Sequence, residues 1–279
     1  MTKHLAVLGS PIAHSKSPLI HSAAYRVLKL DFDYSAIELA AGNLDTLVNS
    51  LDDSWVGLSV TAPLKEEAAK YARDDFERAL GSCNTLVRTN DGWQAHNTDI
   101  FGLRMAFNDL DPKTIKRIAV IGAGATAKSA LAAVAQTFPA TKITLASRRA
   151  EPGRHLANFA LHALKLEVNP TTDIVGAMGR NDLVISTLPA HALDEYAIKL
   201  KRAWLRKPHG VLFDVAYEPW PSKAAELWRN NSLTVINGID MLLWQAIAQI
   251  RLFTSGSVET ELFNEAAVLH AMKDSIGLL

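Results

Sequence analysis

One hexapeptide has the residue types and spacing of a dinucleotide-binding turn. Gly122-Ala123-Gly124-Ala125-Thr126-Ala127 follows an apolar run directly and precedes an Ala-rich stretch of helical period. In a G-x-G-x-x-A turn the first glycine makes the turn, the second lets the backbone approach a pyrophosphate, and the small last residue permits close packing of helix and strand. The N–H groups at the start of the helix would hold the anion. The alternative is a glycine-bearing turn that binds nothing.

The end of the next predicted strand indicates which dinucleotide would bind. An NAD site usually offers an acid to the ribose 2′-hydroxyl about 20 residues beyond the glycines. This chain has Ser147-Arg148-Arg149 there, and two guanidinium groups can pair with a 2′-phosphate. Arg154 could support the same phosphate, whereas the nearby Glu151 leaves NAD open and a solvated arginine pair is the alternative without a ligand. The predicted cofactor is NADP, with NAD as the alternative.

The first half of the chain carries short polar and charged residues beside predicted element ends. Ser15 and Ser17 lie just ahead of a predicted helix, where hydroxyls and backbone N–H groups could hold a carboxylate or simply cap the helix. Lys65 follows a strand and a Pro-containing turn, at the strand end where α/β sheets expose ligand groups. Asp99 precedes a helix. Taken alone, Lys65 could be a solvated charge and Asp99 an N-terminal anion.

Alternating strand-length and helix-length segments must position these residues, and this alternation predicts parallel βα units. Asn90-Asp91-Gly92 indicates a hairpin, and Asp111-Pro112-Lys113 is a polar break after which the pattern restarts. The main predicted strands are residues 5–8, 34–38, 56–60, 117–121, 142–146, 182–186 and 211–215, and the main helices are residues 18–30, 125–136, 241–253 and 258–272.

Several motifs together resemble the shikimate dehydrogenase family, and the resemblance covers essentially the whole chain. Each motif alone is modest, but their joint occurrence in this order is specific. The motifs are Gly9-Ser10-Pro11-Ile12-Ala13-His14-Ser15-Lys16-Ser17-Pro18, Val60-Thr61-Ala62-Pro63-Leu64-Lys65, Gly81-Ser82-Cys83-Asn84-Thr85-Leu86, Asn97-Thr98-Asp99, the glycine turn, and Asn237-Gly238-Ile239-Asp240-Met241-Leu242-Leu243-Trp244-Gln245.

The resemblance implies a reaction and a catalytic pair. The reaction is the reversible NADPH-dependent reduction of 3-dehydroshikimate to shikimate, in the chorismate pathway of aromatic amino acid biosynthesis. The matching Lys65 and Asp99 would face each other across the substrate, with Lys65 exchanging the proton and Asp99 orienting and supporting it. Asn84, Thr61 and Gln245 would bond the ring hydroxyls, Ser15 and Ser17 the carboxylate, and Tyr217 would lie close to the substrate.

The resemblance also implies an α/β fold of two domains with a deep cleft between them. A substrate domain (residues 1–100) would be followed by a Rossmann-type NADP-binding domain (101–237). Helices in residues 238–279 would return to the first domain.

Some positions depart from the family pattern. Many members carry Asn at Ser59, Gly at Ile100, Gly at Ala125, and Asn-Arg-Thr at Ser147-Arg148-Arg149. These departures leave the predicted chemistry in place but weaken the match to the usual 2′-phosphate clamp. An NAD-dependent quinate/shikimate dehydrogenase is therefore one alternative. A catalytically silent dinucleotide-binding regulator is another, although such a protein would have no need of both Lys65 and Asp99.

Composition excludes several other classes. The formal net charge is zero, with 29 basic and 29 acidic residues, which argues against nucleic-acid binding. The single cysteine, Cys83, allows no intramolecular disulfide, and no apolar run is long enough for a signal peptide or a membrane span. No residue cluster has metal-ligand spacing. We expect a cytoplasmic protein without metal or membrane, as a monomer or a homodimer.

Overall fold

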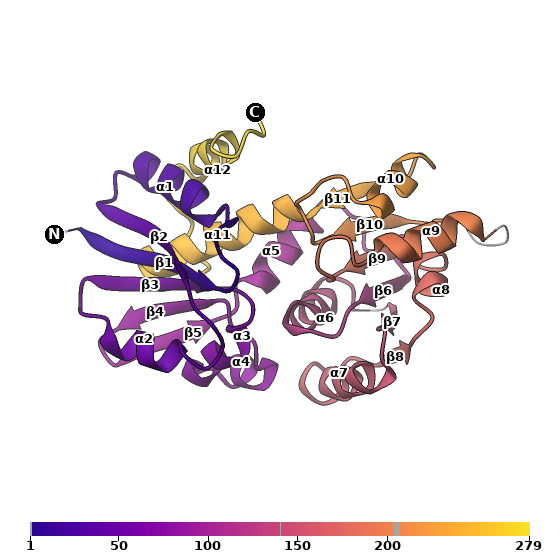
Figure 1. The fold of residues 1–279 in the computed structure, drawn as a ribbon, viewed down its shortest axis with the longest axis horizontal. Helices are drawn as coiled ribbons and strands as arrows, with labels where there is room; N and C mark the ends of the chain where they lie inside the picture. The colour runs from indigo at the N-terminus through magenta and orange to yellow at the C-terminus, as the bar shows by residue number, and fades with distance from the viewer. Residues whose placement is uncertain (1, 140, 204–206) are drawn as a thin grey trace. The chain divides into compact units, whose positions relative to one another are not determined.

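The computed structural model describes residues 2–139, 141–203 and 207–279, and it divides into two compact units (Figure 1). Unit 1 comprises residues 1–102 and 243–279, and unit 2 comprises residues 103–242. Each unit contains one β-sheet. The chain therefore leaves unit 1 within helix α5 (Asp99–Ala106) and re-enters it within helix α11 (Gly238–Ser255).

The sheet of unit 1 has the strand order β2-β1-β3-β4-β5. Its strands are β1 (Lys3–Gly9), β2 (Phe32–Glu38), β3 (Trp55–Val60), β4 (Thr85–Thr89) and β5 (Gly92–His96). Strand β1 is parallel to β2 and β3, whereas β4 is antiparallel to β3 and β5. Thr89 pairs with Gly92 across the turn, which confirms the predicted hairpin.

Helices cover this sheet. They are α1 (Ser17–Leu28), α2 (Leu44–Ser50), α3 (Lys65–Ala68), the 3-10 helix η1 (Ala69–Tyr71), α4 (Asp75–Leu80), the start of α5, most of α11, and α12 (Glu265–Asp274). Leu44 of α2 and Ala68 of α3 belong to one core with the β1 and β3 residues Leu8 and Leu58. Helices α1 and α12 pack against each other.

The last helix starts later than the sequence predicts. Helix α12 begins at Glu265 rather than at Val258. Side chains hold the preceding segment as a loop, because the Arg251 guanidinium donates to the Val258 carbonyl and Glu265 accepts from the Leu262 N–H. These bonds compete with helix formation.

The sheet of unit 2 is a six-stranded parallel sheet in the order β11-β10-β9-β6-β7-β8. Its strands are β6 (Arg117–Ile121), β7 (Lys142–Ala146), β8 (Val168–Thr171), β9 (Leu183–Ser186), β10 (Val211–Asp214) and β11 (Val235–Asn237). The chain order reverses between β6 and β9, which is the Rossmann topology. Ligands of such sheets bind beyond the carboxyl ends of the strands at this reversal. The predicted α/β fold class, with a Rossmann-type second domain, is confirmed.

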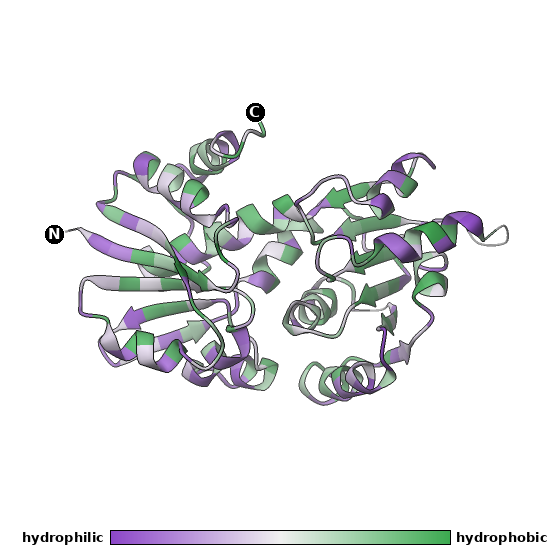
Figure 2. Cartoon of the chain, in the orientation of Figure 1, coloured by the Kyte–Doolittle hydropathy of each residue, from purple (hydrophilic) through white to green (hydrophobic). Residues whose placement is uncertain are grey.

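Hydrophobic residues concentrate on the central strands of unit 2, whereas α9 shows much hydrophilic surface (Figure 2). The helices of this unit are α6 (Ala125–Thr137), α7 (Ala150–Ala163), α8 (Ile174–Met178), α9 (Asp194–Arg202) and α10 (Lys223–Arg229). Trp228 of α10 is fully buried in a core with Val184 and Leu212. Continuous apolar strands are expected where a parallel sheet is covered on both faces.

No helix among the described residues has the length and apolar character needed to cross a membrane.

Candidate active site

Lys65 and Asp99 form a direct ion pair in unit 1. Lys65 is the first residue of α3, just beyond β3, and Asp99 is the first residue of α5. The Lys65 Nζ donates to Asp99 Oδ2 at 2.6 Å, and the two side chains are only 14% and 5% exposed. Burying such a pair has a large desolvation cost, so it is weak evidence for stability. An ammonium held by a carboxylate is, however, suited to proton exchange.

Asn84 holds the second oxygen of the Asp99 carboxylate. It lies between α4 and β4 and is 3% exposed. Its Oδ1 accepts from the Thr98 N–H at 2.7 Å, which turns its Nδ2 toward Asp99 Oδ1 at 2.9 Å. Both carboxylate oxygens of Asp99 therefore have donors, and the carboxylate is fixed in orientation.

Gln245 completes the group that we call the Lys65 cluster, which consists of Lys65, Asn84, Asp99 and Gln245. It lies on α11, is 8% exposed, and its Oε1 is 3.3 Å from Asn84 Nδ2. The neighbouring Trp244 ring meets the Phe101 ring edge-on at 6.4 Å, which anchors this part of α11 to α5. Residues far apart in sequence thus meet within unit 1.

The serines and Thr61 lie at the same edge of the sheet as Lys65. Strands β1 and β3 are parallel neighbours, so the loop that carries Ser15 and the loop that carries Thr61 both follow carboxyl ends of strands. Ser15 Oγ accepts the Ser17 N–H at 3.3 Å, whereas Lys16, the N-cap of α1, makes no side-chain cap bond. Ser15 therefore satisfies one N–H of the first turn, and carboxylate binding by Ser15 and Ser17 stays a prediction.

Tyr217 lies in unit 2, in the loop between β10 and α10. Burial, with a smaller contribution from Glu218, raises the pKa of its hydroxyl. A neutral phenol is therefore its form near neutral pH, and its predicted position beside the substrate stays a prediction.

The glycine turn has the geometry that a pyrophosphate requires. Gly122, directly after β6, has a φ of 124°, and a Cβ there would overlap the Thr187 hydroxyl, so only glycine fits. Gly124 is the N-cap of α6 without a side-chain cap bond, and a Cβ at Gly124 would meet nothing within 4 Å. The space at the start of α6 is therefore open to a ligand. Ala127 is fully buried, as close packing of α6 on the sheet demands, and Ala125 begins the helix.

The residues after β7 fit a 2′-phosphate. Ser147 is 6% exposed and its Oγ donates to the Arg149 carbonyl at 2.7 Å, so it shapes the turn. Arg148 and Arg149 are exposed, and Arg149 is the N-cap of α7, with Glu151 in the first turn of that helix. Two exposed guanidinium groups and an open helix N-terminus in one Rossmann unit match the charge of NADP.

The described residues support neither a metal site nor a reactive thiol. No group of three or more His, Cys, Asp or Glu side chains in the described part of the chain could hold a metal ion. Burial, together with Glu77 and Asp99, raises the pKa of the Cys83 thiol to about 12, which disfavours the thiolate that a nucleophile needs.

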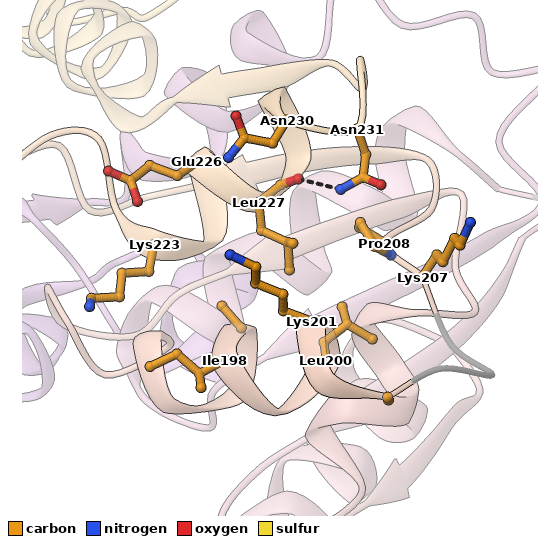
Figure 3. Close-up of a pocket in the computed structure, with 12 residues that line it drawn as sticks. Ile198, Leu200, Lys201, Lys207, Pro208, Lys223, Glu226, Leu227, Asn230 and Asn231 are labelled. Carbon is orange, nitrogen blue, oxygen red and sulfur yellow. Dashed lines mark hydrogen bonds between the residues drawn. The ribbon is translucent and has the colours of Figure 1, made fainter.

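A pocket of about 470 Å³ in unit 2 lies between α9 and α10 (Figure 3). It presents Lys201, Lys223 and Glu226, and none of the predicted site residues lines it. These three charged residues are exposed, unlike the buried Lys65–Asp99 pair.

Two buried residues beside the Lys65 cluster were not singled out from the sequence. Gln249 donates to the Asn84 carbonyl at 3.1 Å. The Tyr34 hydroxyl donates to Ser59, whose hydroxyl donates to Gln249. The spacing of four residues between Gln245 and Gln249 places both on one face of a helix and could have indicated Gln249. No comparable signal marks Tyr34 in the sequence.

Comparison with known proteins agrees with this organisation. Residues 7–86 match the model of the shikimate dehydrogenase substrate binding domain, and residues 118–236 match that of the saccharopine dehydrogenase NADP binding domain. A substrate-binding domain joined to an NADP-binding Rossmann domain defines a two-domain dehydrogenase.

Relatives that match nearly the whole length of this chain identify its family. The NADP(+)-dependent shikimate dehydrogenase of Microcystis aeruginosa is 30% identical over 95% of this chain and 96% of its own, and that of Hyphomonas neptunium is 32% identical over 88% and 89%. The crystal structure of Mycobacterium tuberculosis shikimate dehydrogenase has a TM-score of 0.82 at 33% identity, covering 99% of this chain and 100% of that one. The shikimate 5-dehydrogenase of Mycobacterium fortuitum has a TM-score of 0.79 at 35% identity over 97% and 98%. The chain belongs to the shikimate dehydrogenase family.

Proposed function

We propose that this protein is an NADP-dependent shikimate dehydrogenase that reversibly reduces 3-dehydroshikimate to shikimate in aromatic amino acid biosynthesis. The observation that carries the proposal is the buried Lys65–Asp99 pair, held by Asn84 in a chain that belongs to this family. Unit 1 then carries the proposed substrate residues except Tyr217, and unit 2 carries the proposed NADP residues.

Lys65 is the proton-exchanging residue. The bound cofactor would supply the hydride as NADPH when the ketone is reduced and accept it as NADP+ when the alcohol is oxidised. When the carbonyl is reduced, its oxygen gains negative charge, and Lys65 Nζ binds this oxygen and gives it a proton. In the reverse direction Lys65 takes the hydroxyl proton. Asp99 keeps the ammonium in place and compensates its charge, as the 2.6 Å bond allows.

The remaining predicted residues hold the two ligands. Ser15 and Ser17 would bind the substrate carboxylate, and Thr61, Asn84, Gln245 and Tyr217 would contact the ring and its hydroxyls. For NADP, Gly122, Gly124, Ala125 and Ala127 form the pyrophosphate turn, while Ser147, Arg148 and Arg149 form the 2′-phosphate end. The open space at Gly124 and the exposed arginine pair support this assignment.

The quinate-type alternative is less well supported. A quinate dehydrogenase from Corynebacterium glutamicum in complex with NAD has a TM-score of 0.82, but at 21% identity this likeness shows the fold alone. The end of β7 carries arginines and no acid, which favours NADP. The intact Lys65–Asp99 pair argues against a silent regulator.

A cytoplasmic location and a monomeric or homodimeric state are part of this proposal. The single cysteine and the shikimate-pathway relatives support the location. The test of the proposed function is reduction of NADP by shikimate with the purified protein, and a protein that turns over neither shikimate nor quinate would contradict it.

A further inference from the structure

The side-chain amide of Gln249, next to the Lys65 cluster, uses all of its hydrogen-bonding groups. It is 2% exposed on α11, one helical turn beyond Gln245. Its Nε2 donates to the Asn84 carbonyl and to Thr85 Oγ1, both at 3.1 Å. Its Oε1 accepts from Ser59 Oγ at 2.9 Å and lies 3.2 Å from His21 Nε2. Both amide hydrogens and both lone pairs are thereby used, so Gln249 holds its neighbours in place.

The backbone fixes the direction of these bonds. The Asn84 carbonyl can only accept, so the Gln249 amide must present its NH₂ group to Asn84 and its oxygen to His21. His21 then donates through Nε2–H, and its Nδ1 accepts from the Tyr25 hydroxyl at 3.0 Å. Burial lowers the pKa of His21 to about 3, so the ring is neutral and this single tautomer satisfies every partner.

Tyr34 extends the same set of bonds through Ser59. Its hydroxyl donates to Ser59 Oγ at 2.6 Å, and its ring stacks on His21 with centroids 4.1 Å apart. Burial raises the pKa of the Tyr34 hydroxyl, and the nearby Ser59 and Ser17 side chains oppose this rise. Tyr34 and Ser59 are 5% and 4% exposed, so solvent does not compete for these bonds.

We propose that Tyr34, Ser59 and Gln249 are positioning residues that fix Asn84, and through it Asp99 and Lys65. One continuous chain of hydrogen bonds runs from Tyr34 through Ser59 and Gln249 to Asn84, and Asn84 in turn bonds Asp99, the partner of Lys65. Well-packed apolar side chains would stabilise the fold equally well. Only directional hydrogen bonds, however, fix the position of Asn84. The proposal rests on the proposed function for the choice of substrate.

Two variants and one matched control test it by steady-state kinetics. Gln249→Leu removes all four bonds, and Tyr34→Phe removes only one hydroxyl while keeping the stacked ring. Leu252→Ala is the control, because Leu252 is 3% exposed on the same helix and none of the bonds described above involves it. Rates are normalised to the folded fraction measured by circular dichroism.

The expected pattern separates positioning from stability. Gln249→Leu should raise the KM for shikimate and lower kcat, each roughly tenfold, and Tyr34→Phe should raise the KM roughly threefold, with the KM for NADP unchanged. Leu252→Ala should lower Tm and leave both KM values unchanged. If either folded variant kept wild-type constants, or if Gln249→Leu only lowered Tm as the control does, the proposal would be wrong.

A measurement without substrate separates this proposal from the proposed function. The Thr98 N–H donates to Asn84 Oδ1, so its hydrogen exchange reports the position of Asn84. Relative to amides of β1, exchange at Thr98 should be at least roughly tenfold faster in Gln249→Leu and unchanged in Leu252→Ala. Unchanged exchange in Gln249→Leu would overturn the positioning role. Inactivity of the wild-type protein toward shikimate would overturn the proposed function alone.

Discussion

Lys65 and Asp99 are 34 residues apart in sequence, and a 2.6 Å hydrogen bond joins the Lys65 ammonium to the Asp99 carboxylate. The second oxygen of that carboxylate is bonded to Asn84. These two bonds hold the proposed acid–base pair in one orientation. The family resemblance implies that the two residues face each other across the substrate, and this arrangement stays a prediction.

Replacing Lys65 with Ala should abolish most of the turnover. A positioned acid–base group contributes about 10²–10⁴-fold, so kcat should fall by this amount while the KM for shikimate changes far less. Lys70→Ala is the matched control, because Lys70 is an exposed lysine one turn away that pairs with Asp45 at the surface. Turnover of Lys65→Ala near the wild-type level would refute the assignment.

Replacing Arg148 and Arg149 with Ala should weaken NADP binding selectively. Hydrogen bonds to charged groups contribute about 1.5–3 kcal/mol, so the Kd for NADP should rise by at least one order of magnitude. The Kd for NAD, which lacks the 2′-phosphate, should stay unchanged. Arg202→Ala, an exposed arginine at the end of α9, should alter neither constant. Equal weakening of both cofactors would show that the pair does not recognise the 2′-phosphate.

The two glycines of the turn should respond differently to Ala. Gly122→Ala is strained by the positive φ and by Thr187, and it should lower the free energy of unfolding by about 1–3 kcal/mol. Gly124→Ala has room for its methyl group and should leave Tm nearly unchanged while reducing the affinity for NADP. Calorimetry and NADP titration of both variants check this. Undiminished NADP affinity in Gly124→Ala would argue against backbone approach of the pyrophosphate there.

His21 should make the protein less stable in acid. Its pKa falls from 6.5 to about 3 because the ring is buried, so below pH 6.5 the unfolded chain binds a proton that the folded protein does not. The free energy of unfolding should therefore fall as the pH drops from 6.5 toward 3, by up to about 1.4 kcal/mol per pH unit from this group. Urea denaturation of wild type and His21→Asn between pH 7 and 4.5 measures the difference in slope. Identical slopes would contradict a buried neutral His21.

The sequence predicted the elements whose pattern is local. Strand β6, the glycine turn and α6 were predicted because an apolar run, two glycines and an Ala-rich helix follow one another directly. Strands β8 and β11 were not predicted. Strand β8 contains Pro170 and is a sheet edge with one buried residue, and β11 has only three residues. Neither carries a periodic signal strong enough to detect.

The site residues divide in the same way. Lys65 and Asp99 were singled out through family motifs, because a lone Lys after a strand or a lone Asp before a helix has common structural explanations. Their pairing depends on how β3 and α5 pack, which spacing does not determine. Gln249 and Tyr34 matter through buried bonds between α11, β2 and β3, and such contacts arise only from the tertiary fold.

The most direct test of the central claim is the absorbance of reduced nicotinamide with purified protein, crossing shikimate and quinate with NADP and NAD. Rapid reduction with shikimate and NADP, and little with the other three pairs, is the predicted result. Preferred turnover of quinate, or of NAD, would contradict the assigned specificity. No turnover with any pair would contradict the proposed enzyme itself.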